Sequence, residues 1–188
     1  MDYAAGILLG LGLAASCGFR VFIPLLVSST ASLMGYLEFS AGYEWMGSWP
    51  AFAVFASATI AEIGAYYIPW IDNILDTIAI PLASIAGTLL SLSFVTGMDP
   101  LFQWTLSIIV GGGSAALIKT GASAARLKSS IFSAGFANWI IATIENITSF
   151  IFSVLTVLIP VVMGIFAICT LIYFSYKLLN RKKKVLQQ

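Results

Sequence analysis

Long apolar runs separated by short polar stretches make up most of this chain. A helix needs roughly 17–25 mainly apolar residues to cross the hydrocarbon core of a membrane. By this measure the pattern predicts membrane helices over residues 51–67, 77–96, 101–118, 129–144 and 147–176. Residues 4–37 are apolar as well, but Gly18, Arg20 and Pro24 interrupt them. They predict either two short helices, residues 4–16 and 21–37, or one long broken helix.

Polar residues, glycines and prolines predict where these segments end. Residues 38–49 combine two acids, small residues and an aromatic cluster, which is typical of a loop at the lipid headgroups. We predict a polar hinge over residues 70–76 and a tight turn over residues 97–100. Pro81 is expected in the first turn of its helix, where proline is tolerated, and Pro160 is expected to kink the last helix.

The composition agrees with a membrane protein. Of the 188 residues, 60% are hydrophobic and 9% are charged, whereas soluble domains carry roughly 25% charged residues. The formal net charge of +1 gives no reason to expect nucleic acid as a partner. We predict a single transmembrane domain over residues 1–180 and a basic tail over residues 181–188. Because Asp2 is the only early charge, residues 4–16 are expected to be a retained membrane segment rather than a cleaved signal peptide.

The residue types argue against several kinds of chemistry. Histidine is absent from the sequence, which removes the commonest general base and a frequent metal ligand. Cys17 and Cys169 lie in apolar runs and predict buried thiols rather than a disulfide or a zinc site. The sequence contains no nucleophile elbow, P-loop or zinc-protease motif. We therefore expect no catalytic residues, no metal and no cofactor, and the protein is not predicted to be an enzyme.

Basic residues at the ends of membrane segments predict the topology, because lysine and arginine are retained on the cytoplasmic side. Lys177 and residues 181–184 predict a cytoplasmic C-terminus. Counting back through seven segments puts Arg20, Lys119 and Arg126 on the same side, and re-entrant pieces in place of two spans are the alternative. The tail is expected to anchor this topology, with binding of anionic lipid as the lesser option.

Small residues recur at helical spacing in the first helix and again around residues 111–128. A face without side-chain bulk lets another helix approach closely. We expect these faces to pack within the protomer or, in a homo-oligomer, between protomers, and a ligand groove is the functional alternative. The small residues concerned are Gly6, Gly10, Ala14, Gly18, Gly112 and Gly121.

Similar motifs in two parts of the chain predict an internal repeat, with halves at residues 4–97 and 101–178. Residues 12–20 (GLAASCGFR) resemble residues 112–119 (GGSAALIK), and the later element WIDNI resembles TIENI. Transporter folds are often built from such repeats, with broken helices at the repeat interface. Chance similarity among glycine-rich segments is the alternative.

Charged side chains inside apolar segments are the candidate functional residues, because each of them needs a partner there. Arg20, Lys119 and Arg126 are expected to form an electropositive site. Glu62 lies within a predicted span, and one of these three cations is its expected partner. The two interpretations of that pair are a fixed ion pair that orders the helices and a gating or proton-coupled pair.

Two further polar elements have competing interpretations. Asp72, Asn73 and Asp76 are placed to hold a cation or shift one another's pKa, or to cap the following helix. Glu145 and Asn146 are expected to interrupt the chain and cap the final helix in the same way. We count Asp72 with Glu62 as a counter-charge of the electropositive site, and Glu145 as a structural residue.

An ordered set of motifs resembles a bacterial membrane family known as domain of unknown function 4126. The motifs are GFR, AEIGAYYIPWIDNILDTI, PLASIAG, GGGSAALIKTGASAAR and NWIIATIENITSFIFSVLTVLIP, spread over residues 4–160. The resemblance implies a bacterial inner-membrane protein and supplies no activity. Positions that match the family's pattern are Arg20, Glu62, Pro69, Trp70, Asp72, Lys119, Gly121 and Arg126.

These observations predict an all-α polytopic membrane protein with five to seven membrane segments, some of them broken or re-entrant. The lipid bilayer is its surrounding partner. The favoured function is a small transporter or channel-like protein with an intramembrane site for an anionic solute, an ion or a lipid headgroup. A structural or accessory membrane subunit that packs through Gly/Ala faces is the alternative, and an enzyme acting on lipid is the weakest.

Overall fold

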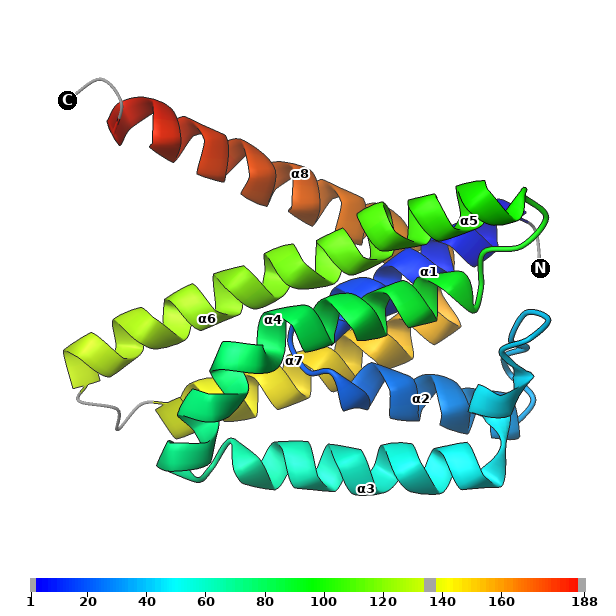
Figure 1. Ribbon diagram of the computed structural model, residues 1–188, viewed down its shortest axis with the longest axis horizontal. Coiled ribbons are helices and arrows are strands. Elements are labelled where there is room, and N and C mark those ends of the chain that lie inside the picture. Colours follow the sequence, from blue (N-terminus) through cyan, green and yellow to red (C-terminus); the bar gives the residue numbers. More distant parts are fainter. Residues whose placement is uncertain (1–2, 134–137, 186–188) are drawn as a thin grey trace.

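A computed structural model describes residues 3–133 and 138–185, and within these ranges the chain forms helices and no strand. Figure 1 shows the helices running back and forth through one bundle. The predicted all-α fold is therefore confirmed. The elements in chain order are α1 (Tyr3–Cys17), α2 (Phe22–Leu33), the short 3-10 helix η1 (Glu44–Gly47), α3 (Trp49–Ala65), α4 (Pro69–Leu92), α5 (Pro100–Leu106), the π-helix η2 (Ser107–Gly112), α6 (Gly113–Ser133), α7 (Asn138–Leu158) and α8 (Pro160–Val185).

Three helices in the described part of the chain are long and apolar enough to cross a membrane. They comprise Ile74–Leu92, Pro100–Leu127 and Asn138–Leu158. Large apolar side chains also face outward, including Ile85 and Ile109, which are each 66% exposed. A continuous apolar surface of this kind requires lipid rather than water around it. The chain is accordingly an integral membrane protein.

α1 and α2 form a helical hairpin in the centre of the bundle. At about 1.5 Å per residue, the 15 residues of α1 and the 12 of α2 extend roughly 22 and 18 Å, less than the roughly 30 Å hydrocarbon core. Leu9, Leu13 and Cys17 of α1 are fully buried. Figure 1 shows α6 and α7 extending well beyond the tip of this hairpin. The tip, residues 18–21, therefore lies inside the bundle, and of the two predicted arrangements the chain forms two short helices.

The glycines of α1 allow this hairpin to pack closely against its neighbours. A Cβ at Gly6 would lie 2.6 Å from the carbonyl oxygen of Phe94, just beyond the end of α4. A Cβ at Gly18 would lie 2.5 Å from Cβ of Ile118 in α6. Gly10 likewise faces α4, Gly112 faces side chains of α4, and Gly121 is half-buried in α6. These faces pack within the protomer.

α4 starts earlier than the sequence pattern predicts. No hinge separates residues 70–76 from the following span, because the helix begins at Pro69 and continues to Leu92. Proline is favoured at the first helical position, where its missing N–H costs nothing. Pro81 consequently lies inside the helix and not in its first turn. The side chains of Pro69, Trp70, Asp72 and Asn73 lie outside the described part of the structure.

The break predicted at Glu145 and Asn146 is wrong, since α7 runs through both residues to Leu158. The chain bends instead at Pro160, where α8 begins, and Figure 1 shows the change of direction. Proline lacks an amide hydrogen and clashes with the preceding turn, whereas a polar side chain inside a membrane helix is tolerated when it has a partner. α8 includes part of the predicted tail and ends at Val185; the side chains of residues 181–188 lie outside the described part.

Candidate functional site

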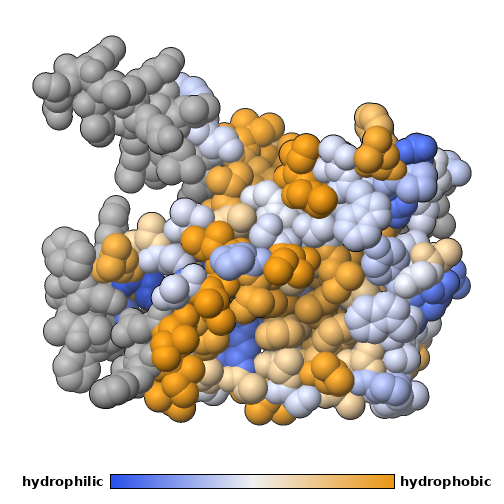
Figure 2. Space-filling model, viewed as in Figure 1, coloured by the Kyte–Doolittle hydropathy of each residue, from blue (hydrophilic) through white to orange (hydrophobic). Residues whose placement is uncertain are grey.

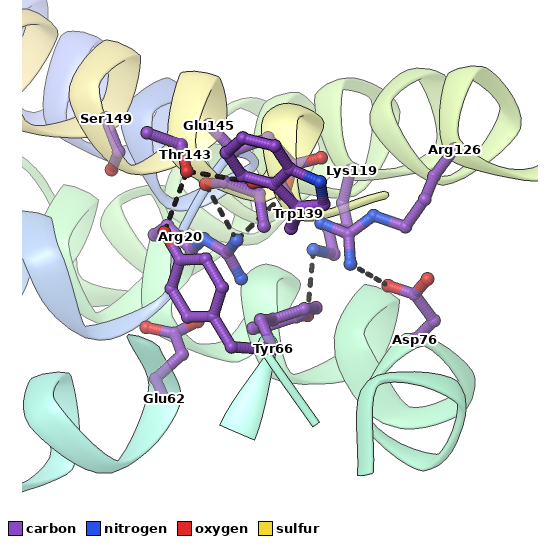
Figure 3. A network of polar contacts seen from close by, with 12 residues as sticks. Arg20, Glu62, Tyr66, Asp76, Lys119, Arg126, Trp139, Thr143, Glu145 and Ser149 are labelled. Atoms are coloured by element: carbon purple, nitrogen blue, oxygen red, sulfur yellow. Dashed lines mark hydrogen bonds and ion pairs between the residues drawn. The ribbon is translucent and has the colours of Figure 1, made fainter. Parts of the chain in front are cut away.

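The aromatic ring of Tyr66 lies at the centre of three buried cations, one from the tip of the α1–α2 hairpin and two from α6 (Figure 3). The guanidinium carbon of Arg20 is 3.6 Å from the ring centroid, that of Arg126 is 4.5 Å away, and Nζ of Lys119 is 5.1 Å away. Lys119 Nζ also donates to Tyr66 Oη at 3.1 Å. Cations are attracted to the negative face of an aromatic ring, most strongly where water is excluded. Tyr66 thus holds Arg20, Lys119 and Arg126 together as one cation cluster.

The local structure explains why these cations converge. Arg20 lies in the tip of the α1–α2 hairpin, which ends inside the bundle. Lys119 and Arg126 are seven residues apart on α6, so they lie on the same face two turns apart. Tyr66 follows the last residue of α3. The exposed fractions of the three cations are 0%, 1% and 2%, so the described fold removes them almost completely from its surroundings.

Glu145 of α7 is the acid that joins two of these cations. Its Oε2 atom lies 3.3 Å from Nη2 of Arg20 and accepts a hydrogen bond from Nη2 of Arg126. The carboxylate of Asp76 on α4 lies 3.7 Å from Nη1 of Arg126. Arg20 donates further to the backbone carbonyl of Ala142, one turn before Glu145, at 3.1 Å. A carboxylate within lipid depth is stabilised by such partners and in turn stabilises them.

Glu62 has a different partner from the one predicted. Its two carboxylate oxygens accept hydrogen bonds from the backbone amides of Val21 and Phe22, at 2.9 and 3.0 Å. These amides lie at the start of α2, where N–H groups have no acceptor within the helix and the helix dipole favours negative charge. Glu62 therefore caps α2 and fixes the hairpin tip that carries Arg20. The acids that form ion pairs with the cation cluster in the described structure are Glu145 and Asp76.

We expect Glu62→Ala to lower the free energy of unfolding by about 1–3 kcal/mol, because two buried amides lose their acceptor. Unfolding in detergent micelles measures the change. Glu44→Ala is the matched control, since Glu44 also accepts from a backbone amide, that of Gly42, but is exposed to solvent. Equal losses of stability in the two variants would contradict the capping role.

The structure brings together Arg20, Lys119 and Arg126, the three cations singled out from the sequence. Asp72 lies one turn before Asp76 in α4, and its side chain lies outside the described part. Sequence reasoning missed Tyr66 as the centre and Glu145 as the bridging acid. A signal for Glu145 was present, because Ala142, Glu145, Ser149, Ser153 and Thr156 recur every three or four residues and all are buried. A polar stripe on an apolar membrane helix faces protein.

Arg20 and its partner Glu145 both have polar atoms without a hydrogen-bond partner among the described residues. These atoms are Nε and Nη1 of Arg20 and Oε1 of Glu145, and each is buried. A buried donor without an acceptor is costly, and more so when it carries charge. The two Arg20 donors can therefore bind an anionic oxygen, which is the chemistry that this arrangement offers.

A recess of about 310 Å³ between α3 and α4 leads toward the cluster. Its wall includes small side chains, Ala58, Ala61 and Ala65, together with Glu62 and Tyr66. Figure 2 shows hydrophilic atoms surrounded by apolar side chains in the region between α3 and α4. Because Tyr66 also contacts the cations, this recess and the cation cluster share one aromatic side chain.

The comparisons with known proteins identify a family and no close relative. A family model described as domain of unknown function (DUF4126) matches residues 7–179. Neither a curated protein nor a solved structure matches the chain. The family match covers α1 to α7 almost completely and most of α8, and so includes every residue of the cation cluster. The chain therefore belongs to the DUF4126 family, as its ordered motifs predict.

Proposed function

We propose that this protein is a small transporter or channel-like protein whose cation cluster binds an anionic solute, an ion or a lipid headgroup. The observation that carries the proposal is the combination of burial and unsatisfied hydrogen-bond donors at Arg20. This side chain is fully buried, yet its Nε and Nη1 atoms have no acceptor among the described residues. A ligand oxygen would supply the missing acceptor.

The surroundings of Arg20 support the same proposal. A purely structural ion pair is stable in an apolar environment when its remaining donors and acceptors are also satisfied. Here Glu145 is shared between Arg20 and Arg126, and Glu62 is engaged by backbone amides. Buried charge beside a short re-entrant hairpin is also the arrangement in which many transporters bind their substrates.

The proposed location is the bacterial inner membrane, as the family resemblance implies, and the distribution of charge supports a cytoplasmic C-terminus. Figure 1 places the C-terminal end of α8 on the same side as the end of α6. The opposite side contains the loop with Glu38 and Glu44 and the turn with Asp99. Lysine and arginine beside membrane spans are retained in the cytoplasm, and the basic residues after Tyr176 follow that rule.

Reconstitution into liposomes tests the proposal. Purified protein is expected to move at least one anion from a panel of chloride, phosphate and short-chain carboxylates, and Arg20→Gln is expected to reduce that flux by about tenfold or more, because a charged hydrogen bond contributes roughly 1.5–3 kcal/mol. Glu38→Gln, which changes an exposed acid, is the control. The size-exclusion profile of each variant checks that it is folded.

Two outcomes would overturn the proposal. One is a folded Arg20→Gln protein with wild-type flux, which would separate transport from the cation cluster. The other is a wild-type protein that moves none of the anions and does not bind or scramble anionic lipid in the same liposomes. Either outcome would leave the cluster as a structural element.

One observation favours the alternative, a structural or accessory subunit. α3 exposes a row of small residues on one face, including Ala53, Ser57, Ala61 and Gly64. A Cβ added at Gly64 would meet no atom within 4 Å, so this face is open to another membrane helix. A stable co-purifying membrane protein or a homo-oligomer, together with the absence of flux, would favour this alternative.

A further inference from the structure

A long apolar groove of about 770 Å³ lies between α2, α3 and α7. We call it the α2–α7 groove and define it by Leu26, Val27, Ile63, Ile151, Val154 and Leu158, which are among its lining residues. Its volume falls within the range of roughly 300–1,000 Å³ found for small-molecule sites.

The groove runs lengthwise from the level of the charged residues toward the end of the bundle. Its lining extends from Ile23 to Met34 on α2 and from Asn146 to Leu158 on α7, which at about 1.5 Å per residue corresponds to roughly 17–18 Å. At the outer end Met34 is 67% exposed. The inner end therefore lies at the hairpin tip, and the outer end opens near the loop that follows α2.

Polar atoms are concentrated at the inner end of the groove. Ile63 and Asn146, which line it, directly follow Glu62 and Glu145 in the sequence. Thr59, which also lines the groove, is only 6% exposed, and its hydroxyl has no hydrogen-bond partner among the described residues. The Oδ1 atom of Asn146 is likewise buried without a partner there. Toward the outer end the lining also includes Thr30, but its hydroxyl is satisfied within its own helix, because it donates to the carbonyl of Leu26 at 2.7 Å.

The inner end is also next to the cation with unmet donors. Arg20 donates to the carbonyl of Ala142, one helical turn before Asn146 on α7. Ile23, at the inner end of the groove, lies three residues after Arg20. Arg20 itself is fully buried and lies behind the inner end, outside the residues that line the groove. The order from there outward is a cation, then two unsatisfied polar atoms, then a mainly apolar groove. That order is complementary to an anionic headgroup, a polar linkage and a hydrocarbon chain.

We infer that the α2–α7 groove binds one acyl chain of an anionic lipid, with the phosphate of that lipid directed toward Arg20. The inference rests on the proposed function and assigns its ligand class. The Thr59 hydroxyl and Asn146 Oδ1 are buried just behind the lining at the inner end. A side-chain rotation on binding would let Thr59 donate to an ester carbonyl of the lipid and Asn146 accept from a hydroxyl. A small soluble anion would use the cation cluster alone and would leave both polar atoms and the apolar groove without a role.

Photo-crosslinking tests this inference with a defined probe. The full-length protein is reconstituted in phosphatidylcholine nanodiscs with a small fraction of phosphatidylglycerol that carries a diazirine at the end of one acyl chain. After illumination, mass spectrometry maps the labelled residues. We expect labels on the groove faces of α2 and α7. The same diazirine chain on phosphatidylcholine is expected to label them about tenfold less, a difference of ~1.4 kcal/mol in binding.

Matched substitutions locate the site. Ile151→Trp fills the groove and is expected to lower groove labelling by about tenfold. Ile165→Trp on α8 is the control, because Ile165 and Ile151 are similarly exposed, at 52% and 48%, and Ile165 does not line the groove. Thr59→Val, which keeps the shape and removes the hydroxyl, is a second and milder variant, expected to reduce labelling without affecting the fold.

The outcomes separate this inference from the proposed function. Equal groove labelling by the two headgroups, insensitivity to both Ile151→Trp and Thr59→Val, or crosslinks showing a second copy of the chain in the groove would overturn the lipid assignment. If those results came with anion flux that depends on Arg20, the proposed function would stand with a soluble ligand. Headgroup-selective labelling without transport would support the lipid site and contradict the transporter.

Discussion

Replacing Glu145 by alanine is expected to lower the free energy of unfolding by about 3–5 kcal/mol, the cost of leaving a buried charge without its partner. Glu145 is 5% exposed and forms ion pairs with both Arg20 and Arg126. Without Glu145, Arg20 loses its ion pair and keeps its hydrogen bond to the backbone carbonyl of Ala142. Unfolding in mixed detergent micelles measures the loss, and Glu38→Ala, at an exposed position, should stay within about 0.5 kcal/mol of wild type.

A double variant separates the structural role of this pair from its functional role. Arg20→Met combined with Glu145→Leu removes the charges of this pair and keeps apolar bulk, which avoids leaving Arg20 buried without its partner. Arg126 then keeps its ion pair with Asp76 at 3.7 Å. We expect the double variant to be more stable than Glu145→Ala and to lose the anion flux. A Glu145→Ala protein as stable as wild type would show that the cations are stabilised in another way.

The second large effect concerns the close contact of α4 with η2. A Cβ at Gly111 would lie 2.5 Å from Cβ of Ser91 and 2.8 Å from the carbonyl oxygen of Gly87. Gly111→Ala therefore forces backbone segments apart, and we expect a loss of about 1–3 kcal/mol. Gly113→Ala, two residues later, meets no atom within 4 Å and has helical dihedral angles. It should stabilise the protein by up to about 1 kcal/mol, since alanine is the better helix former.

The two substitutions are expected to change the stability of the protein in opposite directions, so each serves as a control for the other. Both change glycine to alanine within one turn of the same helical stretch, so helix propensity alone predicts a gain in both. Thermal unfolding of the two variants under identical detergent conditions gives the signs directly. A gain in stability for Gly111→Ala would contradict the close packing of α4 against η2.

Much of this architecture can be predicted from the sequence, because a lipid environment restricts where apolar helices and charged side chains can lie. Apolar length predicts membrane helices, and an arginine in an apolar segment must face protein or water. Arg20, Lys119 and Arg126 were therefore identifiable before any of their neighbours was known. Glycine spacing in the first helix similarly predicts a close helix contact. The pattern predicts the contact and does not specify the partner.

Local sequence patterns do not predict which groups pair with the buried charged residues. Glu62 was expected to pair with a cation, but the free amides at the start of α2 compete for a carboxylate and here bind it. The sequence pattern predicts a helix cap at Glu145, because polar residues are favoured at helix starts. In the folded protein its helix continues, since a residue distant in sequence, Arg20, satisfies the charge. Only the tertiary arrangement decides between these alternatives.

The buried hairpin tip also constrains how the protein is made. Arg20 is synthesised early, and 122 residues separate it from the Ala142 carbonyl that accepts its hydrogen bond. At about 5–20 residues per second a ribosome needs roughly 6–25 s to cover that distance. During this time the first hairpin has no access to α7, so its arginine must stay hydrated at the insertion machinery. α1 and α2 consequently complete their contacts with α7 only after α7 has emerged.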